Sequence, residues 1–228
     1  MGRERGLEAL KRVLFENGLS LVLFGLFLAF TVGQIAAGHL VHNRDLVEHG
    51  RPAIGLVAYL GSGHFLEALF ENWESEFLQM TGFVLLTIKF RQKGSSESKS
   101  LDGDDETDAD PRRHRRDARA PWPVKRGGIA LKLYEHSLSI ALLLLFVLSF
   151  TMHAVGGLMS VNEAHRLHGE LGETLAQYLF SSQFWFESLQ NWQSEFFAVF
   201  AIIVLSIFLR ERGSPQSKPV HAPHSETE

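Results

Sequence analysis

The sequence predicts an all-α membrane protein with four transmembrane helices, arranged as two tandem parallel-repeat hairpins that pack as a four-helix bundle. Three observations favour this class. The 228-residue chain has two uncharged runs, residues 17–43 and 136–162, whose apolar parts are long enough to cross a bilayer. Each run is followed by a shorter apolar block that ends at basic residues. The second half of the chain also repeats the first at one fixed offset.

The first and third spans are predicted over residues 19–38 and 138–157. Each is apolar on all sides for about 20 residues, which at ~1.5 Å per residue covers the ~30 Å of hydrocarbon. A soluble core helix is rarely apolar all round for so long. The N-terminus also has the pattern of a secretory signal peptide, ending in Ala36-Ala37-Gly38. The matching segment in the second half, where cleavage would make no sense, favours a span.

The second and fourth spans are predicted from two short apolar blocks. Residues 77–88 lie between Glu76 and Lys89, and residues 196–209 lie between Glu195 and Arg210. If Lys89 snorkels to the interface, about 14 residues cover only ~21 Å of hydrocarbon. Each helix must then begin further back, which draws Glu76 and Glu195 into the outer part of the membrane. Re-entrant or interfacial segments are the alternative for blocks of this length.

Lys and Arg residues predict the orientation and the division of the chain. They concentrate at the N-terminus, in the centre and in the C-terminal tail, so both termini are expected in the cytoplasm. We expect a cytoplasmic segment over 1–13, repeat 1 over 14–93, a disordered cytoplasmic linker over 94–128, repeat 2 over 129–212 and a disordered tail over 213–228. The linker is polar and highly charged, a composition that cannot bury enough surface to order itself. Its basic part, Arg112–Arg126, reads as ordinary positive-inside charge or as a contact with anionic lipid.

An offset of 119 residues aligns 14–99 with 133–218 without a gap. Asn72-Trp73 then falls on Asn191-Trp192, and Ser75-Glu76-Phe77 falls on Ser194-Glu195-Phe196. Each copy holds two spans, an even number, so both copies have the same orientation. A pseudo-twofold axis along the membrane normal is expected, as in transporters built from parallel repeats.

Three stretches of repeat 1 carry a resemblance to a known family. They are Phe15–Leu21, Gly63–Glu67 and Glu71–Phe77. In this respect the chain resembles a family of bacterial integral membrane proteins catalogued as a domain of unknown function. The resemblance implies a multi-pass protein of the bacterial plasma (inner) membrane. It supplies no activity and no catalytic residues.

The repeated Asn-Trp-x-Ser-Glu-Phe motif provides the candidate functional residues. On a helix, Asn72 and Glu76 share one face with Ser75 beside them. An ionised carboxylate at this depth costs ~2.5–3.5 kcal/mol or more, so it must face the helix interior, be protonated or meet water. The candidates are the polar members of both copies: Asn72, Trp73, Ser75, Glu76, Asn191, Trp192, Ser194 and Glu195.

The first helix of each hairpin offers a partner at similar depth. Gln34 lies four residues before Gly38, and His153 lies four before Gly157. We expect Gln34 to bond Glu76 and His153 to pair with Glu195, a pair that would bind and release protons. The alternative is structural. The tryptophans then form an outer aromatic belt, the Asn and Ser side chains join helices, and the carboxylates are interfacial.

Composition excludes several other classes. The absence of cysteine excludes disulfides, thiolate zinc sites and a cysteine nucleophile. No nucleotide-binding or hydrolase motif is present, so neither an enzyme nor a cofactor is expected. The outer-loop histidines do not predict a metal site, the acidic residues Glu67, Glu71 and Glu74 are read as a solvated face, and a net charge of −4 does not favour nucleic acid.

Two functions follow, from different classes. The first is small-solute, ion or proton transport or handling through the paired intramembrane motif. The alternative is a non-catalytic membrane scaffold or accessory protein that acts through its outer loops and basic linker. The lipid bilayer is the only partner that the sequence predicts.

Overall fold

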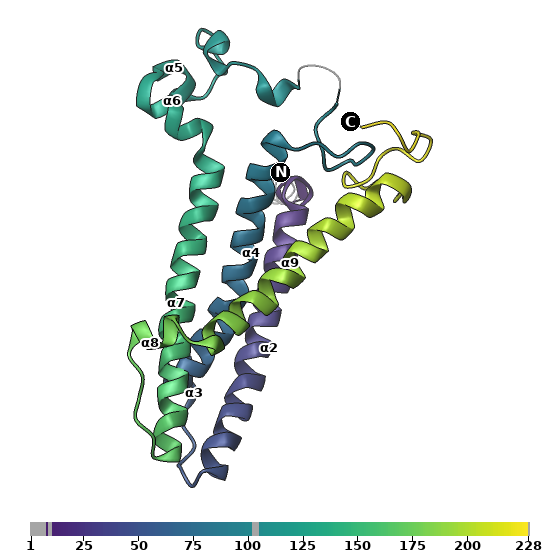
Figure 1. The fold of residues 1–228 in the computed structure, drawn as a ribbon. Helices are drawn as coiled ribbons and strands as arrows, with labels where there is room; N and C mark the ends of the chain where they lie inside the picture. Colours follow the sequence, from purple (N-terminus) through teal and green to yellow (C-terminus); the bar gives the residue numbers. More distant parts are fainter. Residues whose placement is uncertain (1–7, 9–10, 102–104, 228) are drawn as a thin grey trace.

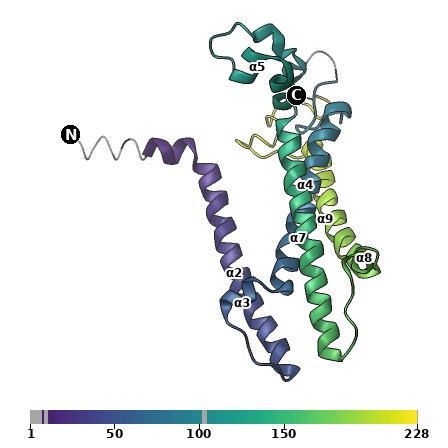
Figure 2. The ribbon, with the colours of Figure 1, turned by 90° about the vertical axis from the view of Figure 1, so that its left-hand side faces the viewer.

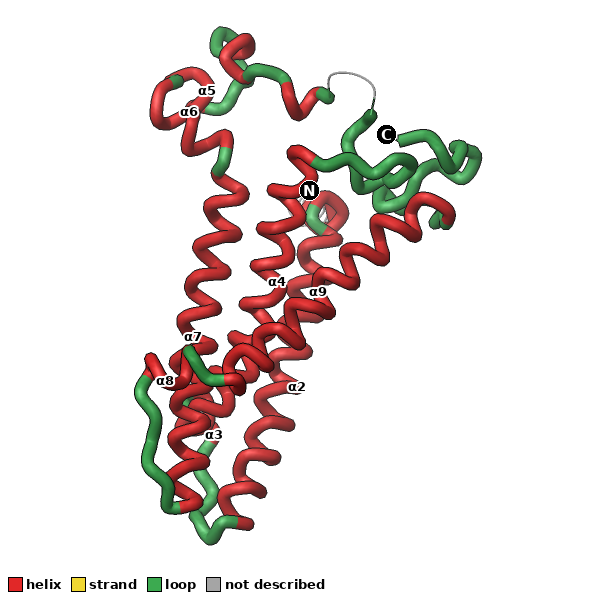
Figure 3. Tube along the Cα trace, viewed as in Figure 1, coloured by secondary structure: helices red, strands yellow, loops and turns green. Residues whose placement is uncertain are grey.

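The structure of the chain, a computed structural model, describes residues 8, 11–101 and 105–227; that part consists of helices joined by loops, without strands (Figures 1 and 3). Four long helices dominate: α2 (Gly18–Glu48), α4 (Gly63–Lys89), α7 (Ser137–His168) and α9 (Ser182–Phe208). Short helices α3 (Leu56–Leu60) and α8 (Leu175–Leu179) precede α4 and α9. The segment between the halves forms η1 (Glu106–Asp108), η2 (Pro111–His114), α5 (Trp122–Arg126) and α6 (Gly128–Glu135). The expectations for residues 1–7, 9–10, 102–104 and 228 lie outside the described residues.

Three of the long helices, α2, α7 and α9, have the length and apolar composition needed to cross a membrane. These are the first, third and fourth of the predicted spans. Helix α4 has the same length as α9, 27 residues, but it carries four glutamates in its first half: Glu67, Glu71, Glu74 and Glu76. Its composition therefore differs from that of the other three long helices.

The two halves contain the same elements in the same order. The bounds of α3 and α4 become those of α8 and α9 when displaced by 119 positions. Loop contacts recur as well. The Asn43 side chain brackets residue 54, accepting from Ile54 N at 2.8 Å and donating to Ile54 O at 3.0 Å. Asn162 brackets residue 173 in the same way, at 2.6 and 3.0 Å.

Helices α4 and α7 run antiparallel, side by side, and form the closest helix pair (Figures 1 and 2). Two glycines permit this approach. A Cβ on Gly63 would lie 2.3 Å from Ser160 N, and one on Gly156 would lie 2.6 Å from Glu67 N. Small residues at such contacts are typical of helix pairs in membranes, because dispersion contacts between backbones drive their association.

The packing of α2 differs from that expected of a four-helix bundle. Helix α9 crosses α4, but α2 diverges from the other three towards its N-terminal end (Figure 2). Its apolar side chains are mostly exposed. Lipid tails are as apolar as another helix, so only specific contacts hold helices together. The contacts that hold α7 against α4 include a polar one from His153, and at the equivalent position α2 has Gln34.

The buried core lies where the second half of α7 meets the start of α9. Tyr178, Phe184 and Ala154 form its centre, where α7, α8 and α9 meet. The Tyr178 hydroxyl packs against Gly157 so closely that a Cβ there would lie 2.0 Å from it. Tyr59 occupies the equivalent place against Gly38, where the distance would be 2.1 Å. Glycine is therefore required at both positions.

Described parts of the linker and tail make contacts with each other, beyond the helices. Gly94 N donates to Thr227 Oγ1 at 2.7 Å, and Ser96 Oγ donates to Gln216 O at 3.1 Å. Ser95 Oγ also lies 2.8 Å from Ser206 Oγ in the last turn of α9. Buried Lys218 donates to three main-chain carbonyls of the tail, those of Pro223, His224 and Glu226. The disorder expected for the linker and the tail stays a prediction, and these contacts join the two segments.

Candidate functional site

A fully buried histidine lies at the centre of the most polar contact between the long helices. His153, in the middle of α7, is 0% exposed and has one ring nitrogen towards each of two carboxylates. Nδ1 lies 2.7 Å from Glu74 Oε2 on α4. Nε2 lies 3.6 Å from Glu187 Oε2 on α9. The imidazole therefore links the three helices at one point.

The Glu74 carboxylate is bound on both oxygens. His153 occupies Oε2, and the indole of Trp192 donates to Oε1 at 2.8 Å. Glu74 is itself 0% exposed, although it lies on the part of α4 that the sequence indicates is solvated. Because a buried carboxylate is costly without partners, these two contacts from α7 and α9 are what allow it to remain there.

The Glu187 carboxylate is bound by two donors from its own half. The Tyr178 hydroxyl donates to Oε2 at 2.9 Å, and Gln183 Nε2 donates to Oε1. His153 Nε2 is buried and makes no hydrogen bond within the described residues, since 3.6 Å to Glu187 is too long for one. The imidazole is thus hydrogen-bonded to Glu74 through Nδ1, whereas its Nε2 lies near Glu187 without a hydrogen bond.

We call Glu74, His153, Glu187, Tyr178 and Trp192 the histidine–glutamate cluster. Phe184 stacks on the imidazole with ring centroids 5.1 Å apart, which fixes the plane of the ring. The buried Tyr178 hydroxyl has Glu187 Oε2 as its hydrogen-bond acceptor, which ties α8 to α9 beside the imidazole.

The cluster joins residues at matching positions along two antiparallel helices. His153 is 16 residues from the start of α7, and Glu74 is 16 residues from the C-cap Phe90 of α4. At ~1.5 Å per residue, both lie ~24 Å from the same end of the helix pair. Two helices that run in opposite directions therefore bring these side chains to one depth.

The predicted motif residues mostly bond to the backbone of their own helices. Asn72 donates to Ala68 O at 2.9 Å, and Ser75 and Ser194 each donate at 2.8 Å to a carbonyl three residues earlier. Asn191 donates to Glu187 O at 3.1 Å and also bonds the Glu71 carboxylate.

The two motif tryptophans differ. Trp73 packs against Phe27, Phe70 and Phe77 in an aromatic group, whereas Trp192 belongs to the cluster. Of the eight motif residues, only Trp192 joins the histidine–glutamate cluster directly.

The two motif glutamates meet where α4 and α9 cross. Glu76 and Glu195 are close enough for their charges to interact, and Glu71 and Gln190 also face each other, at 3.5 Å between Nε2 and Oε1. Both pairs occupy positions 119 residues apart. Glu76 is exposed and Glu195 half-buried, so neither carboxylate lies inside a closed core.

The predicted pairing of the two first-helix residues is wrong. Gln34 donates to Ala68 O at 3.3 Å and not to Glu76. His153 contacts Glu74 and Glu187, and not Glu195. The reason is that α7 packs against α4 of the other half, so His153 meets a carboxylate of the preceding hairpin.

Sequence reasoning missed Glu74, Glu187 and Tyr178 as members of the site. Two of these positions hold different residue types in the two halves: Gln193 stands where the first half has Glu74, and Ala68 where the second has Glu187. The search for identical pairs therefore passed over them. The signal that could have found them is a set of differences between the halves. Glu74, Glu187 and His153 are ionisable, and each has a residue without a charge at the equivalent position of the other half.

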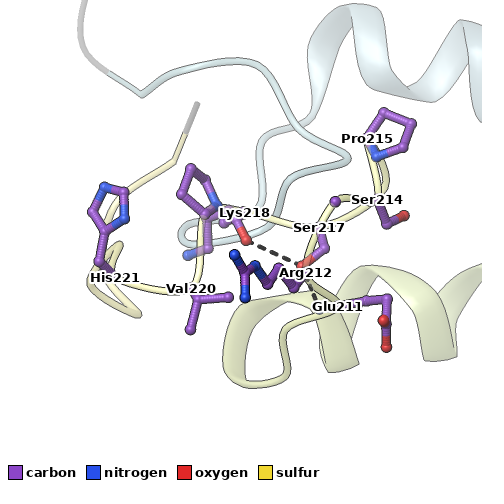
Figure 4. Close-up of a pocket in the computed structure, with 10 residues that line it drawn as sticks. Glu211, Arg212, Ser214, Pro215, Ser217, Lys218, Val220 and His221 are labelled. Atoms are coloured by element: carbon purple, nitrogen blue, oxygen red, sulfur yellow. Dashed lines mark hydrogen bonds between the residues drawn. The ribbon is translucent and has the colours of Figure 1, made fainter.

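The cavities described in the structure lie away from this cluster. The largest, 720 Å³, is a hollow of the C-terminal tail lined by residues of one segment from Glu211 to His221 (Figure 4). Ser217 shapes it by accepting from Glu211 N at 2.9 Å and donating to Lys218 O at 3.1 Å. A second groove of 340 Å³ lies between the C-terminal halves of α4 and α9. Within the described ranges, no group of three or more ligands suited to a metal ion comes together.

Comparison with known proteins gives one match. The family model "Domain of unknown function (DUF6766)" matches residues 10–228, almost the whole chain. No curated protein and no solved structure matches the chain.

Proposed function

The chain belongs to the DUF6766 family, a domain of unknown function, so we infer its role from its own residues and propose that it is an integral membrane protein that binds and releases protons at the histidine–glutamate cluster. One observation carries the proposal: His153, in the middle of the apolar helix α7, is fully buried between the carboxylates of Glu74 and Glu187. Ionisable groups inside a membrane are rare and typical of proton and ion pathways.

The chemistry of the cluster suits proton binding. Histidine is the side chain whose ordinary titration falls nearest neutral pH. A proton on Nδ1 has Glu74 as its acceptor, and a proton on Nε2 has Glu187 within 3.6 Å. Tyr178 donates to Glu187, so the four groups form a row from α4 through α7 to α9 and α8, in which only the 3.6 Å step between His153 and Glu187 is not a hydrogen bond.

The wider architecture is part of the same proposal. It comprises four spans in two hairpins that arose by duplication, with both termini and the linker in the cytoplasm of a bacterial cell and the chain in its plasma membrane. The matching bounds of the two halves and the paired loop contacts of Asn43 and Asn162 support the duplication. The concentration of Lys and Arg at the other end of the helices supports the orientation. We propose no enzymatic activity, cofactor or nucleic-acid partner, and the basic segment Arg112–Arg126 is proposed to face anionic lipid headgroups.

Proton binding is tested by titrating the purified full-length protein from about pH 4 to about pH 10 and comparing it with His153→Gln. The wild type is expected to bind one proton more than the variant over part of this range. Tyr178→Phe keeps all charges but removes a donor to Glu187, and is expected to move that step. Curves for wild type and His153→Gln that coincide throughout would refute the proposal.

Two variants serve as matched controls. His221→Gln removes an exposed histidine of the tail and is expected to delete an ordinary step near pH ~6.5. Tyr59→Phe changes the equivalent tyrosine, which packs against Gly38 and lies 3.4 Å from His64, and is expected to leave the His153 step in place. A dye-reported proton flux in liposomes then separates transport from binding alone.

A scaffold role is the second candidate, and one observation favours it. Asn72, Ser75 and Ser194 bond to their own helix backbones, as expected of side chains that only stabilise helices. On that reading Glu74→Gln and His153→Gln lower the thermal stability of the protein but leave its proton uptake unchanged.

A further inference from the structure

An apolar groove runs between α4 and α9 on the cytoplasmic side of their crossing. Its volume is 340 Å³, and its walls include Phe83 and Leu86 of α4 and Phe196, Phe200 and Ile203 of α9. The groove exists because α9 tilts away from α4 beyond the crossing point (Figure 1). Its walls lie on the apolar parts of both helices, where acyl chains are the surrounding solvent.

The groove continues into a polar hollow at its cytoplasmic end. This hollow, also 340 Å³, shares Phe83, Thr87, Glu97 and Ser98 with the groove. Its other lining residues are polar or charged: Ser96, Lys99, Asp105 and Thr107. An apolar cavity that opens into a polar one has the form of a site for an amphiphile.

Charges of both signs line this composite site. Arg91 and Lys99 are cationic, Glu97 and Asp105 are anionic, and the sum is zero. Lys99 is paired with Asp108 at 2.5 Å, and Asp105 accepts from Thr107 N and Oγ1.

Two of the charged groups retain binding capacity. The Glu97 carboxylate has no hydrogen bond or ion pair within the described part of the chain, and Arg91 uses only Nη1, which donates to the carbonyls of Ile88 and Phe90. The two uncommitted groups are therefore one cation and one anion.

We propose that this composite site binds one phospholipid with a zwitterionic aminoethyl headgroup, of the phosphatidylethanolamine type. An acyl chain lies along Phe83, Phe196 and Phe200. The phosphate accepts hydrogen bonds from Arg91, and the ammonium donates to Glu97. A purely apolar occupant, such as a helix of a second copy, would leave the charged end without partners. An anionic lipid would meet Glu97 with charge of the same sign.

The headgroup preference is tested by native mass spectrometry of the full-length protein in detergent, with equal amounts of three lipids that share the same acyl chains. Phosphatidylethanolamine is expected to exceed phosphatidylcholine by about threefold, the effect of one partly exposed ion pair with hydrogen bonds. Phosphatidylcholine is zwitterionic but has no N–H to donate, and phosphatidylglycerol has no cation. Equal retention of all three lipids would overturn the proposal.

Variants separate the two ends of the site. Glu97→Gln is expected to abolish the preference for phosphatidylethanolamine over phosphatidylcholine, and Arg91→Gln to weaken all three lipids. Val199→Trp fills the groove and is expected to remove bound lipid, whereas Ala198→Trp, which changes the neighbouring residue outside the groove lining, is expected to retain it.

The charged controls are in the C-terminal tail. Glu211→Gln and Arg212→Gln alter the same residue types in the separate tail hollow and are expected to leave lipid binding unchanged (Figure 4). If these controls lose as much lipid as Glu97→Gln and Arg91→Gln, the effect is one of overall charge and the site is refuted. A dimer mass that Val199→Trp abolishes would instead assign the groove to a second copy, and would equally overturn the proposal.

Discussion

At the scale of single residues, neighbours decide whether a charged side chain is a solvated group or part of a site. Glu74 and Glu76 are two residues apart on α4, yet Glu74 is 0% exposed and Glu76 is exposed. Helix α7 covers Glu74 and leaves Glu76 exposed. Sequence spacing places both residues in one turn of α4, and it could not say which face α7 would cover.

Glu97 gives a residue-scale prediction on pH. Burial raises the pKa of this carboxyl above the ordinary value of ~4.3, so on acidification Glu97 takes up its proton before an exposed glutamate does. The ammonium of phosphatidylethanolamine needs the ionised carboxylate. We therefore expect the preference for this lipid to be complete near neutral pH and to be lost as the pH falls through the raised pKa.

The measurement is the ratio of bound phosphatidylethanolamine to phosphatidylcholine as a function of pH, with Glu97→Gln as the reference. The variant is expected to show a low ratio at every pH. A wild-type ratio that stays constant down to about pH 4 would contradict the assignment of the ammonium to Glu97.

At the scale of elements, the α4–α7 pair is the unit that builds the site. It depends on Gly63 and Gly156, whose Cβ positions in a substituted chain would fall 2.3 and 2.6 Å from backbone atoms of the facing helix. Backbone atoms cannot move aside as the end of a flexible side chain can. The separation of the two helices, and with it the contact between His153 and Glu74, therefore depends on the absence of a side chain at Gly63 and at Gly156.

Substitution of these glycines by alanine tests this dependence. Gly63→Ala and Gly156→Ala are each expected to destabilise the protein by about 1–3 kcal/mol, as overpacking does, and to lower its unfolding temperature. Gly33→Ala in α2 is the matched control, because a Cβ there meets no atom within 4 Å, and it is expected to leave the temperature unchanged or to raise it slightly. Equal unfolding temperatures for Gly63→Ala and Gly33→Ala would show that the close approach is not what holds the pair.

The positions of the long helices were largely predictable from the sequence, because they depend on length and apolar composition. The apolar parts placed over 19–38 and 138–157 lie inside α2 and α7, and the block over 196–209 overlaps α9. Helix packing was not predictable in the same way. His153 was expected to meet a carboxylate but was assigned to Glu195, since nothing in the spacing of apolar residues says that α7 packs against α4 of the preceding hairpin.

At the scale of the whole molecule, two halves with the same elements pack differently. The second half contributes His153, Glu187 and Tyr178 to the cluster, whereas the first contributes only Glu74. At the equivalent positions Gln34 and Gln193 carry no charge. Ionisable groups thus meet at the α4–α7 contact, and the equivalent positions of α2 and α9 hold glutamines. This difference is consistent with α7 being packed tightly while α2 is not.

Orientation is the prediction that belongs to this scale. The chain has no cysteine, so single cysteines report accessibility without background. Ala53→Cys and Glu170→Cys in the outer loops are expected to react with a membrane-impermeant maleimide in intact cells. Ala118→Cys in the linker and Ser225→Cys in the tail are expected to react only after permeabilisation. Labelling of Ala118→Cys in intact cells would reverse the orientation, and different behaviour of Ala53→Cys and Glu170→Cys would exclude two hairpins of the same direction.

The divergence of α2 has a mechanical consequence. This helix is joined to the rest of the molecule near its C-terminal end, where Asn43 ties it to the following loop and Gly38 receives Tyr59. The remainder of its length is mostly exposed. In effect α2 is a lever fixed at one end, so swinging its N-terminal end would break few protein contacts and would leave the three-helix junction at His153 undisturbed.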